Sequence, residues 1–535
     1  MNWYENAIFY ELYPRAFADG NGDGYGDFAG IRSRLDYLEW LGVDCIWMTP
    51  VYPSPLRDDG YDVSSYYGID PMYGLMEDFQ LTVDEIHRRG MRIIVDLVVN
   101  HTSDLHPWFV EARRSKDSPM RDYYVWTNDP EKYSEARIIF IDTEESNWAY
   151  DEHSGEYYWH RFYSNQPDLN YDNPQVRAEM MKILDFWLRM GIDGFRVDAV
   201  PYLFERDGTN CENLPETHEF IREMRRYVDE HYPGTLLLAE ANQWPGDLLP
   251  YFGDGDEFQM CFHFPVMPRL YMALAQKDRQ SVVDILAKTP PIPAGCQWAT
   301  FLRNHDELTL EMVTDEDRQF MWDYYAPESR QRLNLGIRRR LAPLMDGDRR
   351  RIELMYSLLL TLPGAPVLYY GDEIGMGDNV ALDDRNGVRT PMQWNDSANG
   401  GFSTAPLENL YNPPVSGPDY GYTHTNVLAQ EVTPGSMLHV IRHMVRTRRE
   451  IPVLARGKLT WLDHLPQHVM CFWRENGGQR VLALHNLTDE SITLELPEAD
   501  GLHDALNEDS SVETEITLPP YGFRWLIEPT EAKSA

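Results

Sequence analysis

Basic residues are scarce in this 535-residue chain, and long apolar runs are missing. The chain has 48 Lys and Arg against 86 Asp and Glu, for a formal net charge of −38. Nucleic acids and anionic membrane surfaces attract proteins through Lys and Arg, so this balance argues against both partners. The longest apolar stretch, near Tyr356, is too short and too polar to span a bilayer. We interpret the acidity as a solvated, self-repelling surface.

Cysteine is also rare, and the five residues have no metal-type spacing: Cys45, Cys211, Cys261, Cys296 and Cys471. Cys45 and Cys261 fall inside apolar runs and are expected to be buried. The N-terminal residues have neither the basic nor the apolar segment of a signal peptide. A reduced, cytoplasmic protein without a disulfide framework is therefore the natural interpretation.

What the chain does contain is a set of short apolar runs that end in polar side chains. Three of them are Gly194-Phe-Arg-Val-Asp198, Leu236-Leu-Leu-Ala-Glu240 and Phe301-Leu-Arg-Asn-His305-Asp306, and an earlier one runs from Arg92 to His101. A continuous apolar run is typical of a strand buried on both faces. Carboxylates at the ends of several such strands would gather at one rim, which suits glycosidic-bond chemistry.

Strand-like and helix-like segments alternate along the chain. Strands are predicted at residues 8–11, 45–50, 91–100, 195–198, 236–240, 258–264, 299–303 and 365–370, and helices at 31–41, 75–89, 174–190, 218–231, 351–362 and 436–449. This pattern predicts an α/β fold, a (β/α)8 TIM barrel. From about residue 451, short alternating runs predict a C-terminal antiparallel β-sandwich domain. The tail from Glu528 to Ala535 is expected to be frayed.

Five ordered motifs resemble those of the α-amylase superfamily, glycoside hydrolase family thirteen. They are Asp96-Leu-Val-Val-Asn100-His101, Gln166-Pro-Asp168-Leu-Asn170, Gly194-Phe-Arg196-Val-Asp198, Leu238-Ala-Glu240 and Asn304-His305-Asp306. The resemblance extends over nearly the whole chain. It implies a catalytic barrel in residues 1–100 and 170–450, an inserted domain in 101–169 after strand three, and a C-terminal β domain in 451–535.

The resemblance also implies a retaining mechanism. Asp198 would be the nucleophile, Glu240 the general acid/base, and Asp306 the residue that orients the sugar and stabilises the transition state. Arg196 lies two residues before Asp198, so it faces the same side of the strand and favours the ionised nucleophile. Neighbouring carboxylates would raise the pKa of Glu240.

The same resemblance assigns a group of side chains to the substrate. His101 and His305 would hydrogen-bond the sugar at the cleavage site, Asp62 paired with Arg389 would bind its far hydroxyls, and Tyr61 would supply a stacking face. Gln166 and Arg196 complete this set. The substrate is expected to be a small disaccharide, and a homo-oligomer is left open.

Two structural calcium sites are predicted, and no organic cofactor. The run Asp19-Gly-Asn21-Gly-Asp23-Gly-Tyr25-Gly-Asp27 repeats oxygen ligands as an EF-hand loop does, with Tyr25 giving its carbonyl, although Gly30 replaces the closing Glu. Mg²⁺ could fill this loop instead, and a Gly/Asp-rich turn without an ion is the alternative. The second site is implied by the family resemblance, with Asn100, Asp168, Glu205 and the carbonyls of Tyr202 and Leu203.

Two further segments, residues 321–341 and 385–394, resemble the trehalose synthase branch, which interconverts maltose and trehalose. The insertion of residues 307–350 would then be a lid that excludes water during the transfer. A solvated surface excursion is the plainer interpretation of this insertion. The alternative functions are a hydrolytic α-glucosidase or oligo-1,6-glucosidase and a non-catalytic carbohydrate-binding relative.

Overall fold

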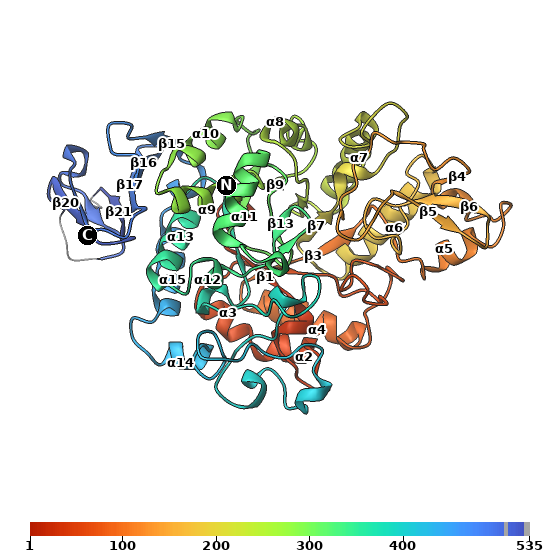
Figure 1. Cartoon of the computed structure of the whole chain (residues 1–535), viewed down its shortest axis with the longest axis horizontal. Coiled ribbons are helices and arrows are strands. Elements are labelled where there is room, and N and C mark those ends of the chain that lie inside the picture. The colour runs from red at the N-terminus through yellow and green to blue at the C-terminus, as the bar shows by residue number, and fades with distance from the viewer. Residues whose placement is uncertain (508–511, 529–535) are drawn as a thin grey trace.

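In the computed structural model, which describes residues 1–507 and 512–528, eight parallel strands close into a barrel (Figure 1). In chain order they are β1 (Phe9–Leu12), β2 (Cys45–Met48), β3 (Arg92–Val98), β7 (Gly194–Asp198), β8 (Leu236–Ala239), β9 (Met260–Phe262), β10 (Gln297–Phe301) and β14 (Ala365–Tyr369). Each of the eight predicted runs supplies one strand, and the expectation of a (β/α)8 barrel is confirmed. Beyond Glu528, the predicted frayed tail lies outside the described residues.

The barrel register explains how distant motifs meet. In the pairing of β3 with β7, Asp96 lies opposite Arg196. Asp198 is the last residue of β7, and Glu240 directly follows β8, where its N–H donates to the carbonyl of Val197 at 3.0 Å. Both carboxylates therefore lie at the C-terminal rim of neighbouring strands, where barrel enzymes place their chemistry.

Helices cover the outside of the barrel (Figure 1). The main ones are α4 (Met76–Arg88), α6 (Pro174–Arg189), α7 (Pro215–His231), α9 (Val266–Gln276), α10 (Gln280–Lys288), α13 (Arg349–Thr361) and α15 (Met437–Glu450). Shorter ones are α1 (Pro14–Phe17), α8 (Pro245–Leu248), α14 (Val427–Glu431) and α16 (Val453–Arg456).

The single helix predicted over residues 31–41 is wrong. The structure has α2 (Phe28–Ser33) and α3 (Leu35–Leu41), separated at Arg34, whose φ of −116° and ψ of 3° are not helical. The side chain of Asp27 caps α2 by accepting from the N–H of Gly30. The apolar spacing continues across the break, which is why the sequence pattern concealed it.

Two excursions leave the barrel. After β3 come α5 (Pro107–Ala112) and a three-stranded antiparallel sheet of β4 (Trp126–Thr127), β6 (Glu156–Trp159) and β5 (Trp148–Asp151). After β10, the segment of residues 307–350 forms β11 (Leu308–Thr309), α11 (Asp315–Tyr325), β12 (Arg332–Leu333), β13 (Gly336–Ile337) and α12 (Leu341–Leu344). Strands β11, β13 and β12 make a small antiparallel sheet.

The C-terminal antiparallel domain is also confirmed. One sheet has the order β15 (Lys458–Trp461), β16 (Val469–Asn476), β17 (Gln479–Asn486), β21 (Phe523–Ile527) and β19 (His503–Asp504), and β18 (Ile492–Glu495) pairs with β20 (Glu515–Leu518). Strands β16 and β17 form a hairpin through Gly477 and Gly478, both at positive φ. The domain packs on α13, where His485 Nε2 lies 2.9 Å from Ser357 Oγ. It lies at the opposite end of the long axis from β4, β5 and β6 (Figure 1).

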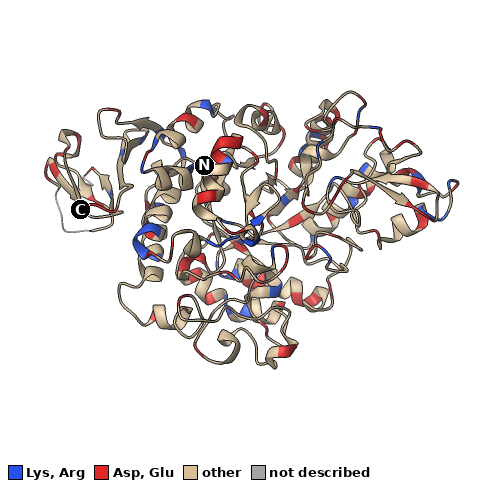
Figure 2. Ribbon diagram, in the orientation of Figure 1, with Lys and Arg blue, Asp and Glu red and all other residues tan. Residues whose placement is uncertain are grey.

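Acidic residues occur in every part of the ribbon, interspersed with Lys and Arg (Figure 2). The net charge is therefore distributed over barrel, excursions and β domain. All five cysteines are buried and unpaired, which confirms the expectation for Cys45 and Cys261. Within residues 1–507 and 512–528, no helix combines the length and apolar character needed to cross a membrane.

Candidate active site

One buried arginine connects three carboxylates at the rim of the barrel. Arg196, with 1% of its side chain exposed, donates to Asp96 at 2.6 Å and also binds Asp198 and Glu240. Asp96 is held in turn by the indole N–H of Trp47 at 2.8 Å. Because every partner comes from a different barrel strand or its end, the guanidinium fixes the two candidate catalytic acids relative to each other.

The surroundings of these two acids set different proton affinities. Burial raises the pKa of Asp198 to about 6, with Arg196 opposing the rise. Burial raises the pKa of Glu240 well above its usual range, and the charges of Asp198 and Asp306 add to the effect. At neutral pH, Glu240 therefore holds a proton and Asp198 is ionised. This is the division of labour that a general acid and a nucleophile need.

Asp306, the third predicted catalytic carboxylate, has surroundings that lower its pKa instead of raising it. Asp306 Oδ1 accepts from Arg385 at 2.9 Å and from Arg389 at 3.0 Å, and His305 Nε2 lies 3.2 Å from Oδ2. Burial works against ionisation, but the neighbouring His305, Arg385 and Arg389 lower the pKa of Asp306 on balance. Because burial lowers the pKa of His305 itself, we attribute the effect on Asp306 to the two guanidinium groups. Asp306 is thus a permanent negative charge.

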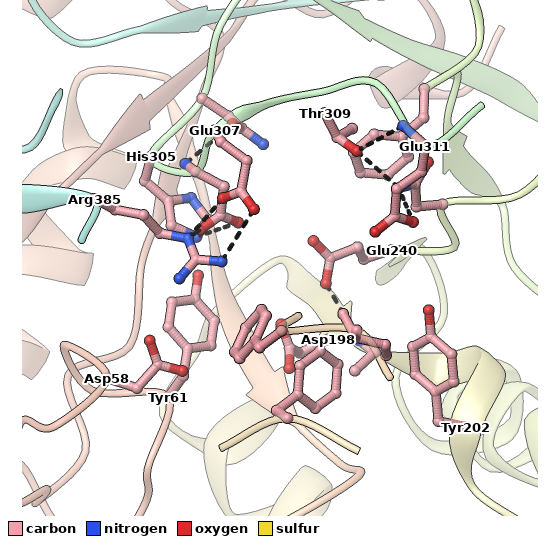
Figure 3. Close-up of a pocket in the computed structure, with 18 of the residues that line it drawn as sticks. Asp58, Tyr61, Asp198, Tyr202, Glu240, His305, Glu307, Thr309, Glu311 and Arg385 are labelled. Atoms are coloured by element: carbon pink, nitrogen blue, oxygen red, sulfur yellow. Dashed lines mark hydrogen bonds and ion pairs between the residues drawn. The ribbon is translucent and has the colours of Figure 1, made fainter. Parts of the chain in front are cut away.

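Asp198, Glu240, His305, Asp306 and Arg385 line a cavity of about 130 Å³ (Figure 3). Asp198 and Glu240 lie on one side of it, and His305, Glu307 and Arg385 on the other. Its apolar and aromatic walls come from Tyr61, Ile139, Phe140, Phe162, Ala199, Tyr202 and Phe264. Aromatic faces beside carboxylates are suited to a sugar ring, which has apolar C–H faces and polar edges.

Several predicted substrate residues lie in this cavity. Tyr61, His101 and His305 line it, and the rings of Tyr61 and His305 stack at 5.2 Å. The hydroxyl of Tyr61 and Nε2 of His101 are buried without a hydrogen-bond partner. Both atoms are therefore available to a sugar hydroxyl. Arg196 acts through the carboxylates that it holds.

The predicted pairing of Asp62 with Arg389 is wrong. Asp62 is fully buried and accepts from Ser54 Oγ at 2.7 Å and from two backbone N–H groups of its own turn. Arg389 pairs with Asp59 at 2.6 Å and with Asp306. The turn needs an internal acceptor for its backbone donors, and Asp62 fills that role.

Asp58 lines the cavity in place of Asp62. Its Oδ2 accepts from Nε2 of Gln166 at 2.8 Å, so the fully buried Gln166 orients Asp58 instead of lining the cavity itself. Burial raises the pKa of Asp58 to about 7, and Arg385 opposes the rise. Asp58 is therefore a candidate acceptor for a sugar hydroxyl that the motif match overlooked.

Further lining residues were missed because they lie in the excursions or after the motifs: Phe140, Asn242, Glu307, Thr309, Glu311 and Arg385. The segments that resemble the trehalose synthase branch contained a signal for Arg385. Glu307 directly follows Asp306 and ion-pairs with Arg385 at 2.8 Å. The sequence gives no indication that these two residues meet on one side of the cavity.

Contacts between the two excursions border the cavity. Arg137, before β5, donates to Glu311 at 2.9 Å and to Glu212 at 2.8 Å. Asn242, after β8, donates to the same Glu311 carboxylate at 2.9 Å. We call Arg137, Asn242, Glu212 and Glu311 the rim cluster. It joins residues 101–169, residues 307–350 and the barrel, and two of its members, Asn242 and Glu311, line the cavity.

One of the two predicted metal sites has an unsatisfied set of oxygens. Asn100 Oδ1, Asp168 Oδ2 and Glu205 Oε1 are all buried and accept no hydrogen bond. Burial raises the pKa of Asp168 to about 8 and that of Glu205 well above its usual range, with Asp168 adding to the effect on Glu205. Tyr202 and Leu203, whose carbonyls were also predicted as ligands, lie just before Glu205. Oxygens buried in this way fit a hard cation such as Ca²⁺.

The N-terminal loop has no such set. Both carboxylate oxygens of Asp19, Asp23 and Asp27 accept hydrogen bonds, and so does Oδ1 of Asn21. Most of the donors are backbone N–H groups of the loop itself. Across residues 1–507 and 512–528, no three Asp, Glu, His or Cys side chains are grouped as a metal site. The prediction of an ion in this loop, with the Tyr25 carbonyl as a ligand, therefore rests on the sequence pattern.

Comparison with known families places the motifs in a wider context. The model of the alpha amylase catalytic domain matches residues 11–326 and 338–457. A second model, the C-terminal immunoglobulin-like domain of D-apionate lactonase, matches residues 466–526.

Individual relatives cover nearly the full chain. A trehalose synthase/amylase from Mycobacterium tuberculosis is 54% identical over 98% of this chain and 90% of its own length. A trehalose synthase from Thermus thermophilus is 54% identical over 92% of this chain and 51% of its own length. An oligo-1,6-glucosidase from Parageobacillus thermoglucosidasius is 31% identical over 93% of this chain and 92% of its own length.

A solved structure of similar shape is an inactive double mutant of the trehalulose synthase MutB in complex with isomaltulose. It has a TM-score of 0.79 and 29% identity, and the match covers 98% of this chain and 99% of that one. The α-glucosyl transfer enzyme XgtA has a TM-score of 0.81 and 26% identity over 99% of this chain and 100% of its own.

Proposed function

Because this chain belongs to the alpha-amylase family, we propose that it interconverts maltose and trehalose by transferring a glucosyl unit within the active site. The observation that carries the proposal is the small cavity in which one arginine holds Asp198 and Glu240, bordered by contacts between the two excursions. The relatives at 54% identity, named trehalose synthases, support the choice of substrate.

The first half of the reaction breaks the α-1,4 bond of maltose. An oxygen of Asp198 attacks the anomeric carbon while Glu240 gives its proton to the glycosidic oxygen, so that free glucose leaves and a covalent glucosyl-enzyme forms. The ionised Asp306, opposite in the cavity, stabilises the positive charge that develops on the ring. Arg196 keeps Asp198 and Glu240 in place through both halves.

The second half depends on which hydroxyl attacks. If the released glucose turns, its anomeric hydroxyl gives its proton to Glu240 and its oxygen attacks the glucosyl carbon, which releases Asp198. Two inversions at the same carbon retain the α configuration and give trehalose. Attack by the 4-hydroxyl would return maltose, and attack by water would give glucose. The balance of products therefore depends on keeping glucose in and water out.

The rim cluster is suited to that task because it joins both excursions at the edge of the cavity, which Asn242 and Glu311 line. We expect Glu311→Gln to weaken the contact with Arg137 and to open the rim. A charge-assisted hydrogen bond contributes about 1.5–3 kcal/mol, so the ratio of glucose to trehalose should rise about tenfold or more. Product ratios from maltose, resolved by chromatography, test this expectation.

The control for this variant is Glu316→Gln, an exposed residue of α11 in the same insertion. It should leave the product ratio unchanged. An E311Q enzyme with the wild-type ratio would mean that the rim cluster does not restrict water.

One incubation separates the candidate functions. With maltose as the only sugar, formation of trehalose supports the proposal. Glucose alone would favour a hydrolytic α-glucosidase or an oligo-1,6-glucosidase, the latter being the name of the Parageobacillus relative. Unchanged maltose would indicate a non-catalytic sugar-binding protein. Incubation with soluble starch tests a second activity, because the Mycobacterium relative is also named an amylase.

We also propose that Ca²⁺ stabilises the seam between the barrel and the inserted residues. Asn100, Asp168, Glu205 and the carbonyls of Tyr202 and Leu203 would hold it, where it would neutralise two buried carboxylates. It plays no part in bond cleavage. The three unsatisfied oxygens support this assignment.

Removal of this ion should lower thermal stability. Binding at 100 times Kd stabilises a protein by about 2.7 kcal/mol, so a chelator should lower the Tm and added Ca²⁺ should restore it. Asp168→Asn should make the Tm insensitive to both. Asp23→Asn, in the N-terminal loop, should keep the response, and a wild-type Tm unaffected by chelator would contradict the proposal.

A further inference from the structure

A buried glutamate contacts the active site from inside the barrel. Glu11 lies in β1 and is fully buried. Its Oε1 lies 2.6 Å from Nδ1 of His305 and accepts from the backbone N–H of His305 at 3.1 Å. Its Oε2 is buried without a partner. Glu11 does not line the cavity, so it reaches the substrate only through His305.

The two ring nitrogens of His305 each face an oxygen. Nδ1 faces Glu11, and Nε2 lies 3.2 Å from Oδ2 of Asp306. Asp306 is ionised because it is paired with Arg385 and Arg389. A proton is therefore needed on Nε2, since a lone pair there would face a negative oxygen. A second proton is needed in the short contact between Nδ1 and Oε1.

With these two protons, Glu11 and His305 together have no net charge. We propose that Glu11 is a positioning residue that shares a proton with Nδ1, so that the Glu11–His305 pair stays neutral and Nε2–H points toward Asp306 and the sugar. The inference rests on the proposed function for its role in catalysis, but the proton count follows from the contacts alone.

The shared proton lies on the glutamate side. Burial raises the pKa of Glu11, and burial lowers the pKa of His305. The charged and titratable groups that face the pair from neighbouring elements are Asp96 on β3, Arg196 on β7, Tyr369 on β14, and Asp306, Arg385 and Arg389. For His305, burial and three guanidinium groups oppose the imidazolium, and Asp306 favours it. For Glu11, burial, Asp306 and Asp96 oppose the carboxylate, and Arg196 and the backbone N–H of His305 favour it. Burial is the largest effect on both residues. The favoured form is a carboxylic acid that donates to a neutral imidazole.

This arrangement has two consequences for the reaction. The Nε2–H donor is fixed in one tautomer and one orientation, since its ring is also stacked on Tyr61. The pair also adds no charge beside Glu240 and Asp198, whose proton affinities then depend on Arg196 and Asp306. An ionised Glu11 would raise the pKa of Glu240 further. It would also keep the proton of a neutral His305 on Nδ1, so that Nε2 would have a lone pair in place of a proton.

Two variants test the role of Glu11. Glu11→Leu removes the donor and should lower kcat/KM for maltose by about 10- to 100-fold, as loss of an orienting partner does. Glu11→Gln carries an N–H that can replace the O–H, so it should recover most of that loss. Because the Glu11–His305 pair is neutral, Glu11→Gln removes no charge. The acid and alkaline limbs of the kcat/KM–pH profile should therefore keep their apparent pKa values.

The matched control is Glu373→Gln. Glu373 is equally buried and accepts from the hydroxyls of Tyr10 and Tyr37, but it does not line the cavity. It reports the general effect of a Glu-to-Gln change in the barrel. The proposal is wrong if E11Q is as impaired as E11L, or if its alkaline limb moves to lower pH, because that shift would report the loss of a buried negative charge.

A measurement on the resting enzyme separates this inference from the proposed function. In protein labelled with ¹⁵N-histidine, the signals of His305 are assigned by their loss in His305→Gln. A protonated Nε2 and an unprotonated, hydrogen-bonded Nδ1 are expected without any substrate. A protonated Nδ1 with a bare Nε2 would overturn the assignment, whatever reaction the enzyme catalyses and whether or not E11L folds.

Discussion

Replacement of Asp198 by asparagine should reduce turnover of maltose by about 10,000-fold or more, as loss of a nucleophile does in other covalent enzymes. The amide has nearly the shape of the carboxylate but cannot form the glucosyl ester. Initial rates of glucose and trehalose formation measure the loss. Asp229→Asn, on the outer helix α7 with about half of its side chain exposed, is the control and should have wild-type rates.

The fold should survive this change. Arg196 keeps Asp96 and Glu240 as partners when Asp198 loses its charge, so no unpaired cation is left in the core. The Tm of the variant should therefore stay near that of the wild type. Lost activity with a large fall in Tm would point to a structural role instead of a chemical one.

A truncated variant identifies the attacking face. In Asp198→Ala, the space left by the carboxylate can admit azide, which would attack the anomeric carbon of an activated glucosyl substrate from the same side. One displacement inverts the carbon, so the product should be β-glucosyl azide. Asp306→Ala should not be rescued in this way. Rescue of D306A but not D198A would reverse the two assignments.

Much of this fold could be predicted because a parallel barrel is buried on both faces of its sheet. Strands such as β8 and β14 therefore appear in the sequence as uninterrupted apolar runs, and a carboxylate at the end of a run, such as Asp198 in β7 or Glu240 after β8, marks the rim. Asp198 and Glu240 follow directly from that rule together with the family motifs. The break between α2 and α3 could not be predicted, because the apolar spacing continues through Arg34 and only the backbone angles change.

The limits of the site prediction are clearest in one turn. Asp58, Asp59 and Asp62 have the same chemistry within five positions, so composition cannot tell which one faces the cavity. The backbone decides: Asp59 and Gly60 both adopt positive φ, 49° and 108°, and this turn directs Asp62 inward and Asp58 toward the cavity. Contacts between the excursions, such as Arg137 with Glu311, depend on two segments 174 residues apart. No local pattern encodes them.

The pH dependence of the reaction follows from the two acids of the site. As pH rises through about 6, Asp198 ionises and kcat/KM should rise. As pH then passes the raised pKa of Glu240, the acid loses its proton and kcat/KM should fall. The two limbs of the pH profile report apparent pKa values of Asp198 and Glu240 together, because Arg196 and the repulsion between the two carboxylates couple their titrations. A variant of Glu240 should therefore remove the alkaline limb.

Replacement of Glu240 by glutamine should lower kcat/KM for maltose by about 1,000-fold, within the range of general acid catalysis. Maltose needs a proton on its leaving oxygen, and the amide cannot supply one. α-Glucosyl fluoride needs no such proton, because fluoride leaves as an anion. The variant should therefore consume the fluoride at a rate near that of the wild type for the first turnover. Glu230→Gln, exposed on α7, should behave as wild type with both substrates.

The second half-reaction then stalls in the Glu240 variant, because no base remains to take the proton of the attacking hydroxyl. Azide is already deprotonated and needs no base, so it should release the glucosyl group from Asp198. Two displacements will then have occurred, and the product should be α-glucosyl azide, the opposite anomer to that from Asp198→Ala. Equal losses of activity on maltose and on the fluoride would show that Glu240 is not the proton donor. The two anomers together assign one face of the sugar to Asp198 and the other to Glu240.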